Sequence, residues 1–476
     1  MSNHYLKLKS NSQNTIKKLF KNVIEAVSGT QQDFTTGSLK RAIFLLSVPM
    51  VLEMLMESIF AIVDIFFVSK LGADAIATVG ITESFITIVY SIAIGLSTAT
   101  TAIVARRIGE KKHKAASIAA FQAIISGFAI SLIIAIPGII YSSEMLLLMG
   151  ASEELVELYS GYTSIMLGGN VVIMLLFIIN AVFRSSGDAA ISMRVLWFAN
   201  ILNIILDPCL IFGLGPFPEL GIVGAAIATT IGRGLAVIYQ FYLLFNGKHR
   251  IRLTLSTLII NFKVLLKLLK LSLGGMFQIL IATSSWIFLV RIISVFGSEV
   301  IAGYTIGIRV IVFALLPSIG ISNASATLVG QNLGANEPSR AEKSVWATGK
   351  INMILLGLIS IVFIVYPEMF IRLFIDNQKV IESGASCLRI VSYGFVVYGL
   401  GMVIVNSFNG AGDTITPTII NLFCFWLIEI PLAYFLSITF GMNEDGVFYS
   451  IIISETLLTL SAMIIFKKGK WKLKKV

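Results

Sequence analysis

Long apolar segments, separated by short polar ones, recur along almost the whole of the 476-residue chain. Each is about 20 residues or longer, which lets a helix cross a hydrocarbon core of roughly 30 Å. The apolar residues run continuously rather than alternating with polar ones, so they predict helices, and only helices and closed barrels satisfy their backbone groups in lipid. The pattern predicts twelve spans, at about residues 42–69, 76–105, 116–141, 155–182, 190–213, 221–245, 265–295, 301–330, 345–366, 381–408, 415–440 and 446–466.

The composition also indicates an integral membrane protein. Of the residues, 56% are hydrophobic and 13% are charged, against about 25% charged in a soluble domain. The first 41 residues are polar and basic, an order that does not fit a cleavable signal peptide. Cys209, Cys387 and Cys424 lie in apolar segments at unrelated spacings, so we predict core residues rather than metal ligands or disulfide partners. We find no metal motif, phosphate loop or nucleophile elbow, and we expect neither an enzyme nor a cofactor.

The net charge of +10 reflects an uneven distribution of basic residues. They gather in the N-terminal tail, in alternate loops such as 106–114 and 248–270, in the loop after the fourth span with Arg184 and Arg194, and in the C-terminal tail, whereas the opposite loops carry acids such as Glu153 and Glu444. Membrane proteins keep an excess of Lys and Arg on the cytoplasmic side. The distribution therefore predicts a multi-pass protein of the inner or plasma membrane with both termini in the cytoplasm, and it implies no nucleic-acid partner.

The N-terminal tail, residues 1–41, contains a second kind of pattern. Within residues 14–28, apolar side chains recur at helical spacing, lysines occupy the other face, and Gly29 follows as a stop. This pattern predicts an amphipathic helix that lies in the cytoplasmic membrane interface. The alternative is a disordered basic tail.

The two halves of the chain repeat each other at a constant offset of 225 residues. Two apolar sequences share Ile and Ala at many positions by chance, so these identities are weak evidence for a repeat. Loop glycines and polar residues that agree in one register are stronger evidence. The pairs that carry the register include Gly72 and Gly297, Gly95 and Gly320, Gly109 and Gly334, Gly187 and Gly412, Asp188 and Asp413, and Glu219 and Glu444. The sequence therefore predicts an internal duplication.

Each repeat contains an even number of spans, so both halves enter the membrane from the same side. Such parallel repeats, related by an axis along the membrane normal, are a known transporter plan in which the cavity lies between the halves. We predict an all-α fold with an N-terminal six-helix lobe at 42–245, a cytoplasmic linker at 246–264, a C-terminal six-helix lobe at 265–466 and a basic cytoplasmic tail at 467–476.

Three acids share one face of the first span. Glu53, Glu57 and Asp64 lie within about 40° of one another around a helix, over roughly 16 Å of rise. Ionisable residues inside a bilayer cost at least about 2.5–3.5 kcal/mol each on insertion scales and mark function by default. This stripe is expected to face protein or a water-filled cavity, with Glu53 and Glu57 as cavity acids.

A second polar group lies in the fifth and sixth spans. Asn203 and Asp207 are four residues apart on one face, at a depth similar to that of Asp64, and Thr229 and Thr230 could add hydroxyl groups nearby. Asn200 is nearly aligned with Asn203, and Pro208 weakens the helix after Asp207. A carboxyl group shielded from water can bind a proton near physiological pH, so this group can exchange a proton or a sodium ion for a cationic substrate. The alternative is that these acids are neutral or paired packing groups.

Further intramembrane polar residues are candidates for the cavity or for ion pairs. Arg233 and Arg309 are expected to pair with acids such as Glu83 or Glu455, although the sequence does not assign the pairs. Tryptophans such as Trp286 can stack on a cationic ligand, but packing is the commoner use. The other candidates are Asn180, Asn200, Thr230, Gln278 and Glu429.

The motifs of this sequence resemble those of the multidrug and toxic compound extrusion (MATE) family over about residues 38–466. The residues that carry the resemblance are Pro49, Asp64 and Leu71-Gly72, GLSTATTAIVARRIGE (95–110), GISNASATLVGQNLGA (320–335), RSSGD (184–188), NGAGD (409–413), and Asn203 with Asp207. The resemblance implies two lobes around a V-shaped cavity and cation coupling through Asp64, Asn203, Asp207 and Thr229. One branch of the family carries coupling acids in helices 7 and 10, but no Asp or Glu occurs between 264 and 298 or between 384 and 412 here.

The leading hypothesis is a secondary active exporter of cationic or amphipathic xenobiotics that works as a monomer, by antiport with H⁺ or Na⁺ and alternating access of the two lobes. The alternative within the same superfamily is a lipid-linked oligosaccharide flippase. The acid stripe argues against a flippase, because pyrophosphate requires a cationic cavity, and Arg309 argues weakly for it. A membrane-embedded enzyme or a receptor is the remaining alternative, but the sequence shows neither paired catalytic groups near an interface nor a large soluble domain.

Overall fold

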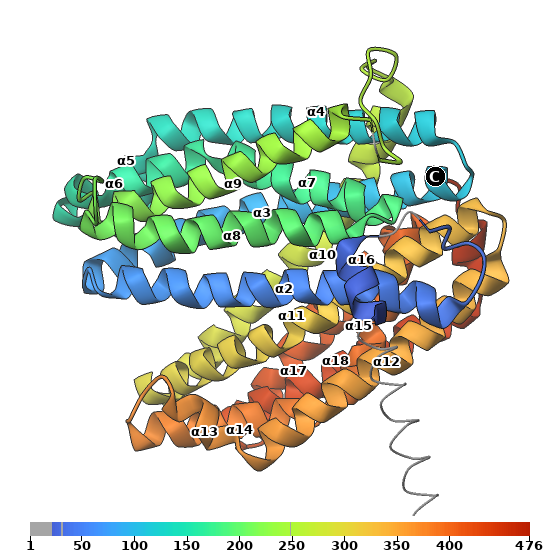
Figure 1. Ribbon diagram of the computed structural model, residues 1–476. Helices are drawn as coiled ribbons and strands as arrows, with labels where there is room; N and C mark the ends of the chain where they lie inside the picture. Colours follow the sequence, from blue (N-terminus) through green and yellow to red (C-terminus); the bar gives the residue numbers. More distant parts are fainter. Residues whose placement is uncertain (1–20, 30–31, 248) are drawn as a thin grey trace, which may run out of the picture.

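The computed structural model describes residues 21–29, 32–247 and 249–476. Within these ranges the chain forms helices and connecting loops, without a β-strand (Figure 1). Residues 21–28 are helical, and Ala26 packs in a buried cluster with Phe34 and Ala42. The rest of the predicted interfacial helix, residues 14–20, lies outside the described residues.

The helices of the first half account for six predicted spans. They are α2 (Leu39–Ser69), α3 (Ala73–Gly109), α4 (His113–Ile140), α5 (Ser142–Leu148), α6 (Glu153–Gly168), α7 (Asn170–Ser186), α8 (Ala189–Phe212) and α9 (Gly221–Phe245). The fourth span consists of α6 and α7, which meet at Gly169. The short α5 follows α4 outside the predicted spans.

The second half repeats this order. Its helices are α10 (Phe262–Ile293), α11 (Ser298–Gly334), α12 (Pro338–Val365), α13 (Pro367–Arg372), α14 (Gln378–Ser392), α15 (Phe395–Ala411), α16 (Ile415–Asn421), α17 (Ile430–Tyr434) and α18 (Glu444–Lys467). The π-helical segment Leu422–Glu429 joins α16 to α17, and a second one, Phe435–Thr439, follows α17, so that one span runs from Ile415 to Thr439.

The prediction of twelve spans is confirmed, because each coincides with a helix or a broken helix. Ten helices among the described residues are long and apolar enough to cross a membrane. The pair α14 and α15, bent by 60°, forms an eleventh span, and the 31-residue α2 is the twelfth. The duplication is visible in the loops as well: Gly187 and Gly412 both adopt left-handed backbone conformations, with φ of 97° and 84°, where α7 and α15 end.

The first helix of each half packs along the second helix of the other half. Helix α10 packs along α3, and α2 packs along α11 as well as α8. Glycine makes both crossings close: a Cβ atom at Gly95 would lie 2.6 Å from the carbonyl oxygen of Ser272, and one at Gly320 would lie 2.6 Å from that of Met50. Because real Cβ atoms do not approach so closely, these positions require glycine in the observed packing.

A reciprocal contact joins α3 and α11 where the two helices end. A Cβ atom at Gly109 would overlap the carbonyl group of Gln331, and one at Gly334 would overlap that of Arg106. Each glycine and each carbonyl has its counterpart at the 225-residue offset, so the contact is made twice across an approximate two-fold axis. The halves are therefore closed at this end, and their helices diverge toward the opposite end, which carries α5, α6, α13 and α14 (Figure 1).

The segment after α18 reaches across the closed end. Trp471 is buried and stacks on Phe466, with ring centroids 4.6 Å apart. Arg106 and Arg107 of α3 donate hydrogen bonds to the carbonyl oxygens of Lys474 and Val476, each at 2.9 Å. This segment of the second half therefore adds a polar link to the first half beside the glycine contact.

We predict that substituting either glycine of the reciprocal contact weakens the closed end. Gly109→Ala and Gly334→Ala should each lower stability by about 1–3 kcal/mol, because the added methyl group cannot fit without moving a backbone. The measurement is the midpoint of thermal unfolding of the purified protein in detergent.

The matched control is Gly80→Ala in the same helix α3, where the added Cβ meets no atom within 4 Å. That change should be neutral or slightly stabilising, because alanine is the better helix former by about 0.5–1 kcal/mol. Equal midpoints for all three variants would show that the reciprocal contact does not limit the closed state.

Candidate functional site

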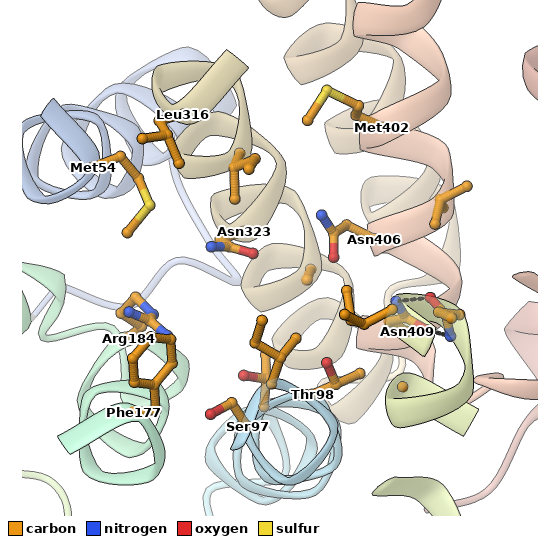
Figure 2. Close-up of a pocket in the computed structure, with 18 of the residues that line it drawn as sticks. Met54, Ser97, Thr98, Phe177, Arg184, Leu316, Asn323, Met402, Asn406 and Asn409 are labelled. Atoms are coloured by element: carbon orange, nitrogen blue, oxygen red, sulfur yellow. Dashed lines mark hydrogen bonds between the residues drawn. The ribbon is translucent and has the colours of Figure 1, made fainter. Parts of the chain in front are cut away.

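A cavity of about 550 Å³ lies between the two halves, next to the closed end. The side chains that line it come from α2, α3, α7, α8 and α9 of the first half and from α10, α11, α15, α16, the segment Leu422–Glu429 and α18 of the second half. Figure 2 shows Asn323 of α11 and Asn406 of α15 among the lining side chains, with Ser97 and Thr98 of α3 near them. The cavity is therefore shared by both halves rather than enclosed in one.

Carboxamide groups are the commonest polar groups in the cavity wall. Their residues are Asn180, Gln278, Asn323, Asn406, Asn409 and Asn421. The carboxamides of Gln278 and Asn409 hydrogen-bond to each other in both directions, at 3.1 and 3.0 Å. Of these residues the sequence pointed to Asn180 and Gln278 alone, because an isolated asparagine in an apolar helix carries little signal.

Glu53 of α2 forms an ion pair with Arg184 of α7. The Oε1 and Nη1 atoms are 2.5 Å apart, and the Glu53 side chain is only 2% exposed. The apolar pattern predicts Arg184 in the loop after the fourth span, as part of the positive-inside distribution. This placement is wrong: α7 continues to Ser186, so Arg184 lies in its last turn and lines the cavity (Figure 2).

Glu57, one turn further along α2, is also paired. Its Oε1 atom lies 3.6 Å from Nη2 of Arg233, and its Oε2 atom accepts a hydrogen bond from the Asn200 amide at 3.0 Å. Arg233 additionally donates to the Tyr90 hydroxyl at 3.0 Å and lies over the Phe60 ring. Arg233 thus pairs with an acid, as expected, but the acid is Glu57 rather than Glu83 or Glu455, because α9 packs against α2 and α8 within the first half.

The residues of the proposed coupling group form a separate polar cluster inside the first half. Asp207 is fully buried on α8, and Asn203, one turn before it, contacts Thr229 of α9. With its amide nitrogen toward Asp207, Asn203 donates to Oδ2 of Asp207 at 2.8 Å and accepts from the Thr229 hydroxyl at 3.0 Å. None of these three residues lines the cavity between the halves.

Asp64 lies near this cluster rather than on the cavity. Its carboxylate is close enough to Asp207 to repel it electrostatically, and close enough to Arg233 to be attracted. The three acids of the predicted stripe therefore divide along α2: Glu53 and Glu57 line the cavity, and Asp64 faces the interior of the first half. Asn200 hydrogen-bonds to the cavity acid Glu57 and is therefore not part of the buried cluster around Asp207. Thr230 packs against Gly169.

The remaining candidates occupy different surroundings. Asn180 accepts a hydrogen bond from Gln240 at 2.7 Å and lines the cavity, as does Glu455. Glu429 is buried behind the cavity wall, where Ser285 and Ser454 donate to it at 2.6 and 3.2 Å. Trp286 is 41% exposed and does not line the cavity. Glu83 and Arg309 are also exposed and lie outside the cavity wall, where their opposite charges attract each other.

Equivalent positions of the two repeats line opposite walls. At the 225-residue offset, Glu53 corresponds to Gln278 and Arg184 corresponds to Asn409. The ion pair of the first half thus has a neutral hydrogen-bonded amide pair as its counterpart in the second half. Glu57 corresponds to Ala282, which also lines the cavity.

We predict that removing one partner of the Glu53–Arg184 pair is more harmful than removing both. Glu53→Gln or Arg184→Met should each cost about 3–5 kcal/mol, because a buried charge loses its partner, whereas the double variant should recover most of this loss. Unfolding midpoints of the four proteins in detergent give the coupling energy. Additive losses in the double variant would contradict the pairing.

Comparisons with known proteins agree with this architecture. The family model described as MatE matches residues 49–209 and 275–435, once in each half. The chain is 25% identical over 404 residues to the probable multidrug resistance protein YoeA of Bacillus subtilis (84% of this chain, 87% of the relative). It is 26% identical over 411 residues to an FAD transporter of Shewanella oneidensis (86% and 89%).

A solved structure has the same fold. It is described as the outward-facing conformation of a multidrug resistance MATE family transporter of the MOP superfamily. It superposes with a TM-score of 0.87 at 24% identity and covers 93% of this chain and 98% of its own. The family match spans most of both halves, and the chain therefore belongs to the MATE family of multi-pass membrane transporters and is not an enzyme.

Proposed function

We propose that this protein exports cationic or amphipathic compounds, as a multidrug antiporter driven by H⁺ or Na⁺. The observation that carries the proposal is the buried group of Asp64, Asn203, Asp207 and Thr229 inside the first half, set apart from a cavity between the halves that is large enough for a small molecule. An antiporter needs both features, one site for the coupling ion and one for the cargo. A single chain supplies the whole cavity, so the proposed unit is a monomer.

The orientation in the membrane follows from the basic residues. Arg106, Arg107, Lys111 and Lys112 all lie where α3 ends, beside the reciprocal glycine contact. The positive-inside rule assigns this closed end to the cytoplasm. Both termini then face the cytoplasm, and the cavity is open to the outside of an inner or plasma membrane.

The Asn203 carboxamide suits a group that exchanges a proton. When Asp207 is ionised it can only accept, so the amide nitrogen of Asn203 faces it and the amide oxygen accepts from Thr229. Protonated Asp207 can instead donate to the amide oxygen, which requires the amide to turn by 180° and brings the amide nitrogen against the backbone N–H of Thr229. The ionised state is therefore the better hydrogen-bonded one, and proton exchange at Asp207 is coupled to the orientation of this amide.

Arg233 connects the ion site with the cavity in this mechanism. It lines the cavity, pairs with Glu57 and is attracted to Asp64. When Asp64 gains a proton or a sodium ion, its attraction for Arg233 weakens and the guanidinium group favours Glu57. Occupancy of the ion site thereby alters the charge that the cargo meets in the cavity.

The names of the relatives support export of small molecules. YoeA is named for multidrug resistance and the Shewanella relative for FAD transport. The charges of the cavity favour a cation over an anionic dinucleotide, because three acids and two arginines line it. The lipid-linked oligosaccharide flippase is not favoured, since Glu53 and Glu57 already neutralise both arginines.

We predict that Asp64→Asn and Asp207→Asn each abolish coupled export while the protein still inserts. Neutral asparagine cannot bind and release the coupling ion, so ethidium efflux from proteoliposomes should fall at least tenfold. Imposing a pH gradient and a sodium gradient separately identifies the ion in the unaltered protein.

The matched control is Asp74→Asn, which removes an exposed acid in the first turn of α3 and should transport normally. Undiminished efflux by both the Asp64 and the Asp207 variants would refute the carboxylate mechanism. Absence of efflux by the unaltered protein under either gradient would refute the cation exporter itself.

A further inference from the structure

The charges that line the cavity do not balance. Glu53 is paired with Arg184, and Glu57 with Arg233 and Asn200. The fifth charged residue of the wall is Glu455 of α18, which has no ion-pair partner among the described residues. The charge left for a cationic cargo is therefore in the second half.

Glu455 lies in a corner built by three helical segments of the second half. Tyr398 of α15, Asn421 at the end of α16 and Phe425 in the following π-helical segment line the cavity with it. Asn421 is 8% exposed, and neither its Oδ1 atom nor Oε2 of Glu455 has a hydrogen-bond partner within the described residues. Two enclosed oxygen acceptors in one cavity wall, both without a donor, indicate a site for a positively charged or donor group.

The aromatic residues of the corner fit the same kind of ligand. Tyr398 lies within electrostatic range of Glu455, and Phe425 follows Asn421 by one helical turn on the same wall. Aromatic faces attract cations by about 0.5–2 kcal/mol, more when water is excluded. A lipophilic cation can therefore place its charge at the two oxygens and its apolar groups against the rings.

Glu429, a neighbouring acid of the second half, has a different environment from Glu455 and a packing role. It is 5% exposed, does not line the cavity, and accepts hydrogen bonds from Ser285 and Ser454. The two acids come from neighbouring segments, the π-helix Leu422–Glu429 and α18, yet the serines satisfy only one of them. Of these two neighbouring acids, the one that lines the cavity is thus the one without a donor to its enclosed oxygen.

We propose that Glu455, with Oδ1 of Asn421, binds the positive charge of the cargo, and that this corner selects monovalent lipophilic cations. The proposal rests on the proposed function, because it assigns the cargo of that same cavity. It places the cargo charge in the second half and the coupling ion in the first, so the two cations do not compete for one carboxylate.

The test measures binding of tetraphenylphosphonium, a permanent cation, to the purified full-length protein by equilibrium dialysis. Glu455→Gln should weaken binding at least tenfold. Triphenylphosphine oxide, a neutral molecule that also carries phenyl rings, should bind the unaltered protein and this variant equally. Glu429→Gln is the matched control and should bind tetraphenylphosphonium within twofold of the unaltered protein.

Two further variants keep the test decisive if Glu455→Gln fails to fold. Glu455→Asp retains the charge and should bind the cation much better than Glu455→Gln or, where that variant is lost, within fivefold of the unaltered protein. Asn421→Leu removes the second oxygen at similar volume and should weaken cation binding at least threefold.

The outcomes separate this inference from the proposed function. If the unaltered protein binds and exports the cation while Glu455→Gln and Asn421→Leu bind it equally well, the corner is not the cargo site and the exporter stands. If the unaltered protein exports no cation under either gradient, the proposed function fails and this assignment fails with it. Selective loss of cation binding, with neutral binding intact, supports the assignment.

Discussion

The close approach of α3 and α11 is the constraint on which the rest of the structure depends. At Gly109 and Gly334 each helix lies directly against a backbone carbonyl of the other, so no side chain separates the halves there. In a bilayer the hydrophobic effect does not press helices together, and small residues that allow close packing take its place. Because the contact joins equivalent positions, it closes one end of the molecule and leaves the cavity beside it.

Pairing governs the polar groups that this arrangement brings into the membrane. Glu53 and Glu57 would be costly as isolated charges, and each has an arginine from another helix of the first half. Asp207 is satisfied by an amide rather than by a cation, which leaves its charge free to change. The structure thus separates acids that are paired with arginine from Asp207, whose partner is an amide.

The sequence predicted the fold because the membrane allows few solutions. Spans of apolar residues must be helices, and loop glycines such as Gly187 and Gly412 keep their register where a left-handed backbone is needed. The Asn203–Asp207 pair was also predictable, since four residues bring side chains together on one helix.

The ion pairs were not predictable in the same way. Glu57 and Arg233 are far apart in the sequence, and Arg184 was mistaken for a loop residue because α7 extends further than its apolar run. The repeat register relates Glu53 to Gln278 and Arg184 to Asn409, but it states which positions are equivalent and not that they touch. The contact between Glu53 and Arg184 depends on how α2 and α7 each pack against α8, which no local pattern encodes.

A duplicated scaffold with unequal chemistry suits an exchanger. If both halves carried the same carboxylates, cargo and coupling ion would find two similar sites, and binding at one would say nothing about the other. Here the position of Asp207 is occupied by Leu432 in the second half, and that of Glu455 by Thr230 in the first. Helix α2 carries Asp64 beside the ion cluster and Glu53 and Glu57 on the cavity, and it packs along α11 of the other half. On the proposed function, α2 therefore links occupancy of the ion site to the charges of the cavity. Through its contact with α11, the same helix also links the ion site to the position of the second half.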